Sequence, residues 1–227
     1  VLVCVKAYDV DGIVAELRAT ESRWCRVGDA GQPYTRIITF QNGVGAEERA
    51  HEAFGAERVI AATLTSPGAM PALGVIRLGR AGGGIGLAPC NGPLPDLSRS
   101  AVAAALKQSH PDPFVLLHDT LKQSLLRVET YGDYRSMKWS KLFLNILSNA
   151  TSAILGLTPA QVYADTRLFE LEMRMLREAL AVTQAARIPL IDLPGVPAAW
   201  LARLVRRLPD LMLRPLLIRS IARGRGD

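Results

Sequence analysis

The chain has 227 residues, of which 49% are hydrophobic and 21% charged, a composition typical of a globular protein and not of a disordered or fibrous one. No apolar run reaches the roughly 18 residues that a membrane helix needs. The formal net charge is +6, but from residue 187 onward eight Arg face three Asp, a difference of +5, so the charge belongs to the tail and not to a nucleic-acid-binding surface across the chain.

The three cysteines, Cys4, Cys25 and Cys90, are widely spaced and form no C-x-x-C pair. An odd number without such a pair favours neither a disulfide framework nor a metal site, so we expect no metal. A reducing, cytoplasmic location follows as an expectation.

Three buried strands, each followed by a helix or a loop, are predicted in the first part of the chain. The apolar run 1–5 predicts a fully buried strand, and a helix follows to about Ala19 after the candidate caps Asp9 and Asp11. Residues 20–35 read as a polar loop. The strand 37–40, the helix 46–54 and the strand 58–65 continue the alternation, which is typical of a parallel sheet with crossover helices.

Helical patterns dominate the second part of the chain. Short strands near 74–78 and 84–87, a helix over 98–108 and a strand over 125–131 complete the first part. Beyond them, helices are predicted over 134–155, 159–187, 197–208 and 210–223. We therefore expect two domains, 1–132 with the sheet and 133–227 all helical.

Polar residues or glycines follow each of the three predicted parallel strands. Lys6 follows the first, Asn42 and Gly43 the second, and the segment 65–68, ending in Gly68, the third. Since ligands of open parallel sheets bind outside the carboxyl ends of the strands, we expect this edge to carry a binding site. The Asn-Gly pair alone would equally well be an ordinary turn.

A narrow polar stripe is predicted on the helix that opens the second half. At about 100° per residue, Lys141, Asn145 and Asn149 fall within roughly 80° of one another, with Lys138 on or beside the same stripe. An amphipathic helix with its polar side in water is the alternative. Against it, Asn is a poor helix former, and solvated faces usually carry Glu, Lys, Arg or Gln. A Lys beside amides suits ketone reduction, because a positioned acid must stabilise and protonate the developing alkoxide.

Three segments, 5–8 (VKAY), 41–45 (QNGVG) and 139–149 (WSKLFLNILSN), together resemble ketopantoate reductase, the 2-dehydropantoate 2-reductase family. They come in that family's order and at about its spacings, and the resemblance covers nearly the whole chain. It implies a Rossmann-type domain followed by a helical domain like the C-terminal domain of 6-phosphogluconate dehydrogenase. It also implies NADPH-dependent reduction of ketopantoate to pantoate, on the route to pantothenate and coenzyme A.

The resemblance also assigns roles to the candidate residues. Lys141 would be the general acid, and Asn145 and Asn149 would hold the substrate. Lys6 and Asn42 would contact NADPH, with Asn42 also near the substrate, and Gly68 is a weaker cofactor candidate.

Two departures from the family pattern lead us to expect a fragment. The family opens with a strand and a G-x-G-x-x-G turn for the pyrophosphate, and nothing like it precedes Val1. The family also places a Ser and a Glu late in the helical domain, and this chain stops before them. We therefore expect the 227 residues alone to be inactive, and NADPH over NADH rests on the resemblance.

Several alternatives remain open at this stage. A related reductase of another 2-keto acid would keep the fold and the hydride chemistry. A non-catalytic nucleotide-binding or dimerisation protein would keep only the fold. The basic tail 211–223 is amphipathic, as in membrane-surface or nucleic-acid binders, but packing on a domain core explains its apolar side equally well. We expect a small 2-keto acid as the partner, with no nucleic acid and no membrane; the oligomeric state, a homodimer included, stays open.

Overall fold

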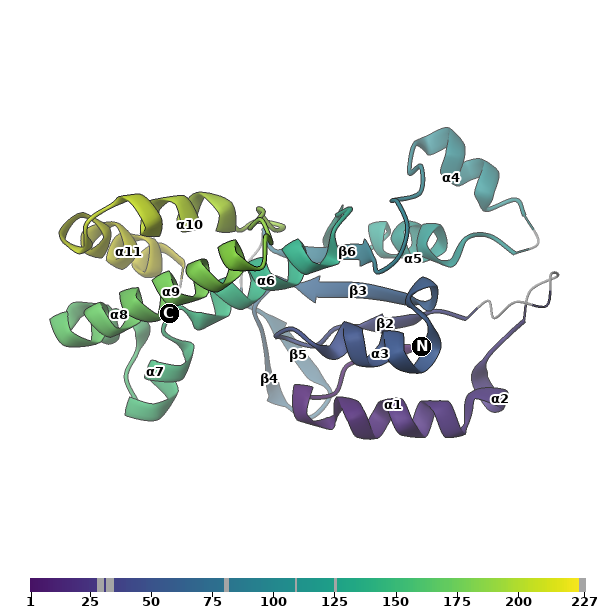
Figure 1. Cartoon of the computed structure of the whole chain (residues 1–227), viewed down its shortest axis with the longest axis horizontal. Coiled ribbons are helices and arrows are strands. Elements are labelled where there is room, and N and C mark those ends of the chain that lie inside the picture. The colour runs from purple at the N-terminus through teal and green to yellow at the C-terminus, as the bar shows by residue number, and fades with distance from the viewer. Residues whose placement is uncertain (28–30, 32–34, 80–81, 109, 125, 225–227) are drawn as a thin grey trace. The chain divides into compact units, whose positions relative to one another are not determined.

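A computed structural model of the chain describes residues 1–27, 31, 35–79, 82–108, 110–124 and 126–224. It divides into two compact units (Figure 1). The first unit comprises Val1–Lys138 and Leu193–Val196, and the second comprises Trp139–Asp192 and the residues from Pro197 onward. Among the described residues, no helix combines the length and the hydrophobicity needed to cross a bilayer.

The first unit is an α/β unit built on a five-stranded sheet. Its strands are β1 (Leu2–Val3), β2 (Ile37–Thr39), β3 (Val59–Leu64), β6 (Gly84–Pro89) and β7 (Arg127–Thr130), and they lie in the order β1-β2-β3-β6-β7. The first three are mutually parallel, β6 runs antiparallel to β3, and β7 is parallel to β6. A separate hairpin is formed by β4 (Gly68–Ala72) and β5 (Val75–Leu78).

Helices and short turns of helix connect these strands. They are η1 (Ala7–Asp9), α1 (Val10–Ala19), α2 (Glu21–Trp24), α3 (Ala46–Phe54), η2 (Ala56–Arg58), α4 (Arg99–Ala105) and α5 (Pro113–Lys122). The helix α5 was not predicted, although Asp112 caps its N-terminus by accepting the N–H groups of Phe114 and Val115, and Pro113 stands at its first turn. Residues 20–35 were expected to be a loop, but α2 forms within them; positions 28–30 and 32–34 lie outside the described residues.

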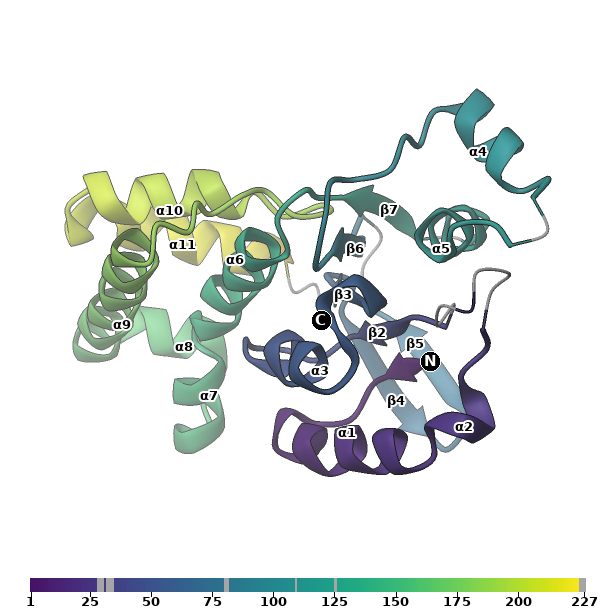
Figure 2. The ribbon, with the colours of Figure 1, turned by 45° about the vertical axis from the view of Figure 1, so that its right-hand side comes forward.

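Both faces of the central strands are covered, which explains why they are apolar without alternation. On β2, Ile37 packs in one cluster with Val3 and Phe54, whereas the next residue, Ile38, packs in another with Ile60 and other apolar residues. Figures 1 and 2 show α1 and α3 together on the same side of the sheet, and α5 contacts β7. Two hydrophobic layers therefore enclose the sheet.

The strand β1 differs from its prediction. It has two residues instead of five and lies at the end of the strand order, where Leu2 is 61% exposed. Among the described strands β1 pairs only with β2, so its other edge is unpaired there, which accounts for the exposure of Leu2. The predicted strand 125–131 corresponds to β7, and Leu125 lies outside the described residues.

The second unit is all helical, as expected. Its helices are the greater part of α6 (Tyr134–Ile146), followed by α7 (Asn149–Leu155), α8 (Pro159–Ala164), α9 (Thr166–Ala185), α10 (Ala198–Arg207) and α11 (Asp210–Gly224). Two predicted helices are each divided in two, 134–155 at residues 147–148 and 159–187 at Asp165. Asp165 caps α9 by accepting the N–H groups of Arg167 and Leu168, and this cap fixes the second break. One apolar core holds these helices together, with Phe143, Tyr163 and Leu176 buried at its centre.

A short turn between α9 and α10 belongs to the first unit. Leu193 and Val196 exchange backbone hydrogen bonds of 2.9 and 2.8 Å, and Thr65 donates its hydroxyl to the carbonyl of Pro194 at 2.7 Å. Gly195 has a φ of +69°, and a Cβ there would lie 1.7 Å from the carbonyl oxygen of Gly82. Only glycine fits this position. The expected class, an α/β unit followed by a helical unit, is confirmed by the order of the elements. The antiparallel pairing of β6 with β3 departs from the expected parallel sheet.

Candidate functional site

The carboxyl ends of β1, β2 and β3 lie at one edge of the sheet, because the three strands are neighbours and parallel. Lys6 follows β1 and precedes η1, and Asn42 follows β2; both side chains are exposed. The structure therefore brings these two predicted cofactor residues to the same edge, as the sequence pattern indicated.

The turn after β2 leaves its backbone open to a ligand. Gly43 and Gly45 have φ values of +91° and +103°, and a Cβ built on either would meet nothing within 4 Å. The turn then enters α3 at Ala46. Exposed backbone beside a polar edge is a suitable cradle for part of a nucleotide, and a larger residue at Gly43 would be strained.

Gly68 is placed differently from the two other cofactor candidates. It lies beyond the end of β3 and opens β4, where it pairs with Leu78 in the hairpin outside the main sheet. From the sequence, Gly68 was expected at the end of the third strand. A role for Gly68 therefore depends on the hairpin and not on the strand end.

Lys138 does not belong to an exposed polar stripe. Its side chain is 2% exposed, and its ammonium lies 2.9 Å from a carboxylate oxygen of Glu47, which is 1% exposed. The ammonium also donates to the backbone carbonyls of Gln41 and Ala62 at 2.6 and 3.3 Å. These three oxygens use all three N–H groups of a lysine. Sequence reasoning missed this buried pair because Glu47 reads as an ordinary first-turn acid of a solvated helix.

Lys141, one turn further along α6, has the opposite environment. It is half-buried, and burial alone lowers the pKa of its ammonium below that of a free lysine. No described carboxylate forms an ion pair with it. Asn145 follows at i+4 on the same helix and is also half-buried, so the two side chains share one helical face.

Asn149 does not continue this face, because α6 ends before it. The backbone turns at Ser148, which has a φ of +54°, and Asn149 opens α7 with its side chain exposed. The buried carboxylate of Glu172 on α9 accepts the Ser148 N–H at 2.8 Å and the Thr151 hydroxyl at 2.5 Å. The Ser148 N–H therefore has a side-chain acceptor in place of the carbonyl four residues back, which explains the break.

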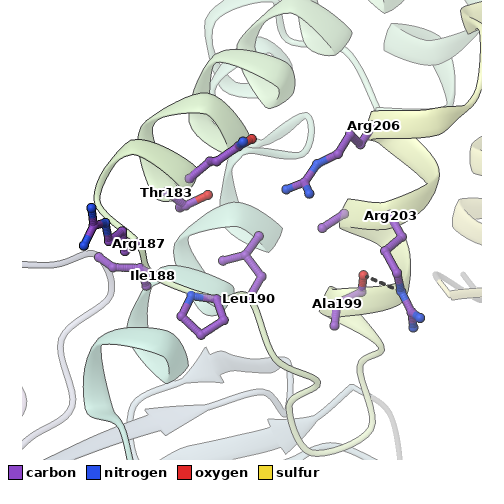
Figure 3. Close-up of a pocket in the computed structure, with 10 residues that line it drawn as sticks. Thr183, Arg187, Ile188, Leu190, Ala199, Arg203 and Arg206 are labelled. Atoms are coloured by element: carbon purple, nitrogen blue, oxygen red, sulfur yellow. Dashed lines mark hydrogen bonds between the residues drawn. The ribbon is translucent and has the colours of Figure 1, made fainter.

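A separate pocket of about 500 Å³ lies in the second unit, between the end of α9 and α10. Figure 3 shows Arg206 pointing toward its centre, opposite Thr183 and Leu190, while the guanidinium groups of Arg187 and Arg203 point away. None of the predicted site residues lines it. It is therefore no part of the candidate site.

Comparisons with known proteins identify the family. Residues 1–88 match the family model described as ketopantoate reductase PanE/ApbA, and residues 133–226 match the model described as ketopantoate reductase PanE/ApbA C terminal. No curated protein matches the chain.

Solved structures share the fold at low sequence identity. A 2-dehydropantoate 2-reductase from Geobacter metallireducens is 20% identical with a TM-score of 0.65, and the match covers 100% of this chain and 61% of that one. A D-mandelate dehydrogenase in complex with NADH is 15% identical with a TM-score of 0.62, covering 100% and 66%. A PanE/ApbA family ketopantoate reductase from Ralstonia eutropha is 20% identical with a TM-score of 0.61, covering 97% and 74%. The chain thus spans less than two thirds of the length of the first two structures.

Proposed function

The chain belongs to the ketopantoate reductase family, and we propose that the protein reduces 2-dehydropantoate to pantoate with NADPH as the hydride donor. Pantoate is the precursor through which such an enzyme would supply pantothenate and coenzyme A. Lys141 would act as the proton donor.

The contrast between the two lysines of α6 carries this proposal. Lys138 is fully buried, and all its donors are occupied, so it has no proton to give to a substrate. Lys141 is half-buried without a carboxylate partner among the described residues, and burial lowers its pKa, which brings its proton-transfer equilibrium closer to neutral pH. Of the two, Lys141 has the properties of a general acid.

The residues at the edge of the first unit fit a nicotinamide nucleotide. Lys6 offers a cation, Asn42 an amide, and the Gly43–Gly45 turn an uncovered backbone; Gly68 remains a weaker candidate on the adjoining hairpin. When bound, the nucleotide supplies a hydride to the keto carbon. The choice of NADPH over NADH rests on the family resemblance.

The remaining polar residues would orient the substrate. As the carbonyl carbon accepts the hydride, negative charge develops on its oxygen, and the Lys141 ammonium stabilises that charge and transfers its proton there. A 2-hydroxy acid results, and solvent reprotonates the amine. Asn145 and Asn149, with Asn42, would hold the carboxylate and hydroxyl groups of the substrate, Asn149 from the start of α7.

The test uses the full-length gene product, with NADPH oxidation followed in the presence and absence of ketopantoate. Replacing Lys141 with Ala should lower kcat by about 10²- to 10⁴-fold while NADPH binding persists. Lys122→Met, which changes an exposed lysine of α5, should behave as wild type. Turnover by the Lys141 variant within about twofold of wild type would refute its role as the acid.

Reduction of another 2-keto acid is the second candidate. A D-mandelate dehydrogenase, also solved with NADH and anilino(oxo)acetate, shares the fold at 14–15% identity. A panel of branched, unbranched and aryl 2-keto acids, each assayed with NADPH and NADH, separates the two candidates. The substrate with the highest kcat/KM decides, and turnover of none by a protein that binds nucleotide would favour a non-catalytic nucleotide-binding or dimerisation protein.

A further inference from the structure

A buried hydrogen-bond network connects the ends of all three parallel strands. Its centre is the Lys138 ammonium, which reaches the Gln41 carbonyl just beyond β2 and the Ala62 carbonyl within β3. The Gln41 side chain extends the network to the first strand, because its Nε2 donates to the carbonyls of Val3 and Val5 at 2.8 and 3.3 Å. One lysine and one glutamine thus join the end of β1, the residue after β2 and the second half of β3.

Glu47 fixes the lysine in this position. It accepts from the Lys138 ammonium at 2.9 Å, and the same oxygen accepts the Thr39 hydroxyl at 2.7 Å. Thr39 is the last residue of β2, and Glu47 stands in the first turn of α3. The carboxylate therefore anchors the lysine between the strand and the helix that flank the Gln41–Gly45 turn.

Two of the bonded carbonyls occupy a particular place in the chain. The Val5 carbonyl belongs to the peptide bond that leads into Lys6, and the Gln41 carbonyl belongs to the peptide bond that leads into Asn42. These are the two predicted cofactor residues at this edge. The network therefore holds the backbone immediately before each of them.

Stability alone does not explain a fully buried ion pair. Taking two charges out of water costs about as much as their attraction returns, and apolar residues of similar volume often replace such a pair without loss. An apolar pair could not, however, donate to the carbonyls at the strand ends. What the charged pair adds is a defined position for these carbonyls.

We propose that Lys138, Glu47 and Gln41 are positioning residues that hold Lys6 and Asn42 in the geometry required for nucleotide binding. The inference rests on the proposed function, and none of the three needs to touch the nucleotide. It gives Lys138 a purpose distinct from that of Lys141, although only two residues separate them.

The main test is a double variant of the full-length protein, Lys138→Met with Glu47→Gln, called here the paired variant, which replaces both charges by neutral side chains. It removes the ammonium without leaving a buried carboxylate unpaired, and the Gln at position 47 keeps an acceptor for Thr39. We expect a cooperative thermal transition, a dissociation constant for NADPH raised about tenfold in fluorescence titration, and faster deuterium uptake in the peptides covering residues 1–8 and 40–45. Lys122→Met is the control and should change none of these.

A second variant, Gln41→Met, keeps the ion pair and removes only the donor to Val3 and Val5. It should raise the dissociation constant for NADPH with increased uptake confined to residues 1–8. If the paired variant does not fold, Gln41→Met still tests whether the network positions the backbone for nucleotide binding.

The outcomes separate this inference from the proposed function. Wild-type NADPH affinity and wild-type deuterium uptake in a folded paired variant, or in Gln41→Met, would show that the network is only structural. A wild-type protein that binds no nicotinamide nucleotide would refute the proposed function and this inference with it. A wild type that binds nucleotide but reduces no 2-keto acid refutes the proposed activity alone.

Discussion

The buried carboxylate of Glu172 offers a test of the break between α6 and α7. Glu172 is 0% exposed and accepts two hydrogen bonds, from the Ser148 N–H at 2.8 Å and from the Thr151 hydroxyl at 2.5 Å. Replacing Glu172 with Ala removes both acceptors and leaves two donors in a dry environment. The turn that positions Asn149 then loses the acceptor of the Ser148 N–H.

The size of the effect follows from these contacts. A hydrogen bond to a charged group contributes about 1.5–3 kcal/mol, and a buried donor left without a partner costs about 1–3 kcal/mol. Because Glu172→Ala leaves the Ser148 N–H and the Thr151 hydroxyl without an acceptor, we expect the free energy of unfolding to fall by about 4 kcal/mol. Glu172→Gln keeps one acceptor oxygen and should cost about half as much, and Thr151→Val, which removes one donor, about 1–2 kcal/mol.

Urea denaturation followed by far-UV circular dichroism measures these differences. Glu170→Ala, an exposed position on the same helix, is the matched control and should stay within about 0.5 kcal/mol of wild type. A double-mutant cycle of Glu172→Ala and Thr151→Val should show coupling of about 1–2 kcal/mol. A Glu172→Ala protein as stable as the Glu170 control would refute the role of this carboxylate in the break.

Three further predictions concern other parts of the chain. Gly195→Ala should lower the free energy of unfolding by about 2 kcal/mol or more, because Gly195 has a φ of +69° and a Cβ there would lie 1.7 Å from a carbonyl oxygen. Gly12→Ala in the first turn of α1, where a Cβ would meet nothing within 4 Å, should raise the free energy of unfolding by about 0.5 kcal/mol. Equal effects of the two substitutions in thermal melts would contradict this. Burial raises the pKa of the Cys90 thiol to about 12, so at pH 8 only about one Cys90 thiol in ten thousand is ionised. Iodoacetamide should therefore modify the exposed Cys4 before Cys90, which peptide mass spectrometry measures. If Lys141 is the proton donor, as proposed, kcat/KM of the full-length protein should fall as pH rises through the lowered pKa of Lys141, because the acid must be protonated. Lys141→Arg should lack this decrease, and an unchanged alkaline limb in that variant would assign the titration to another group.

Local features of the sequence were sufficient to predict the outline of the fold. Apolar runs broken by caps and glycines predicted β2, α3 and β3, because strand and helix periodicity are properties of neighbouring residues. The polar residues after β1 and β2 share one edge because strands joined by crossover helices run parallel. The change from strands to helices after residue 132 was also predicted, because helical periodicity is a property of neighbouring residues.

Partners far apart in the sequence were decided only by the tertiary structure. Lys138 was read as part of a polar stripe, but Glu47 neutralises it in the interior of the first unit. The predicted helix 134–155 breaks because Glu172, on another helix, accepts the Ser148 N–H.

The physical reason is the same in both cases. Periodicity gives the direction of a side chain around its own helix, but whether a buried charge or a free N–H is acceptable depends on the group that meets it. That group is supplied by a remote segment, brought there by the packing of apolar faces. The sequence by itself therefore determined β2, α3, β3 and the family resemblance. The tertiary structure decided which of the two lysines on α6 is buried in an ion pair and which is half-buried without a carboxylate partner among the described residues.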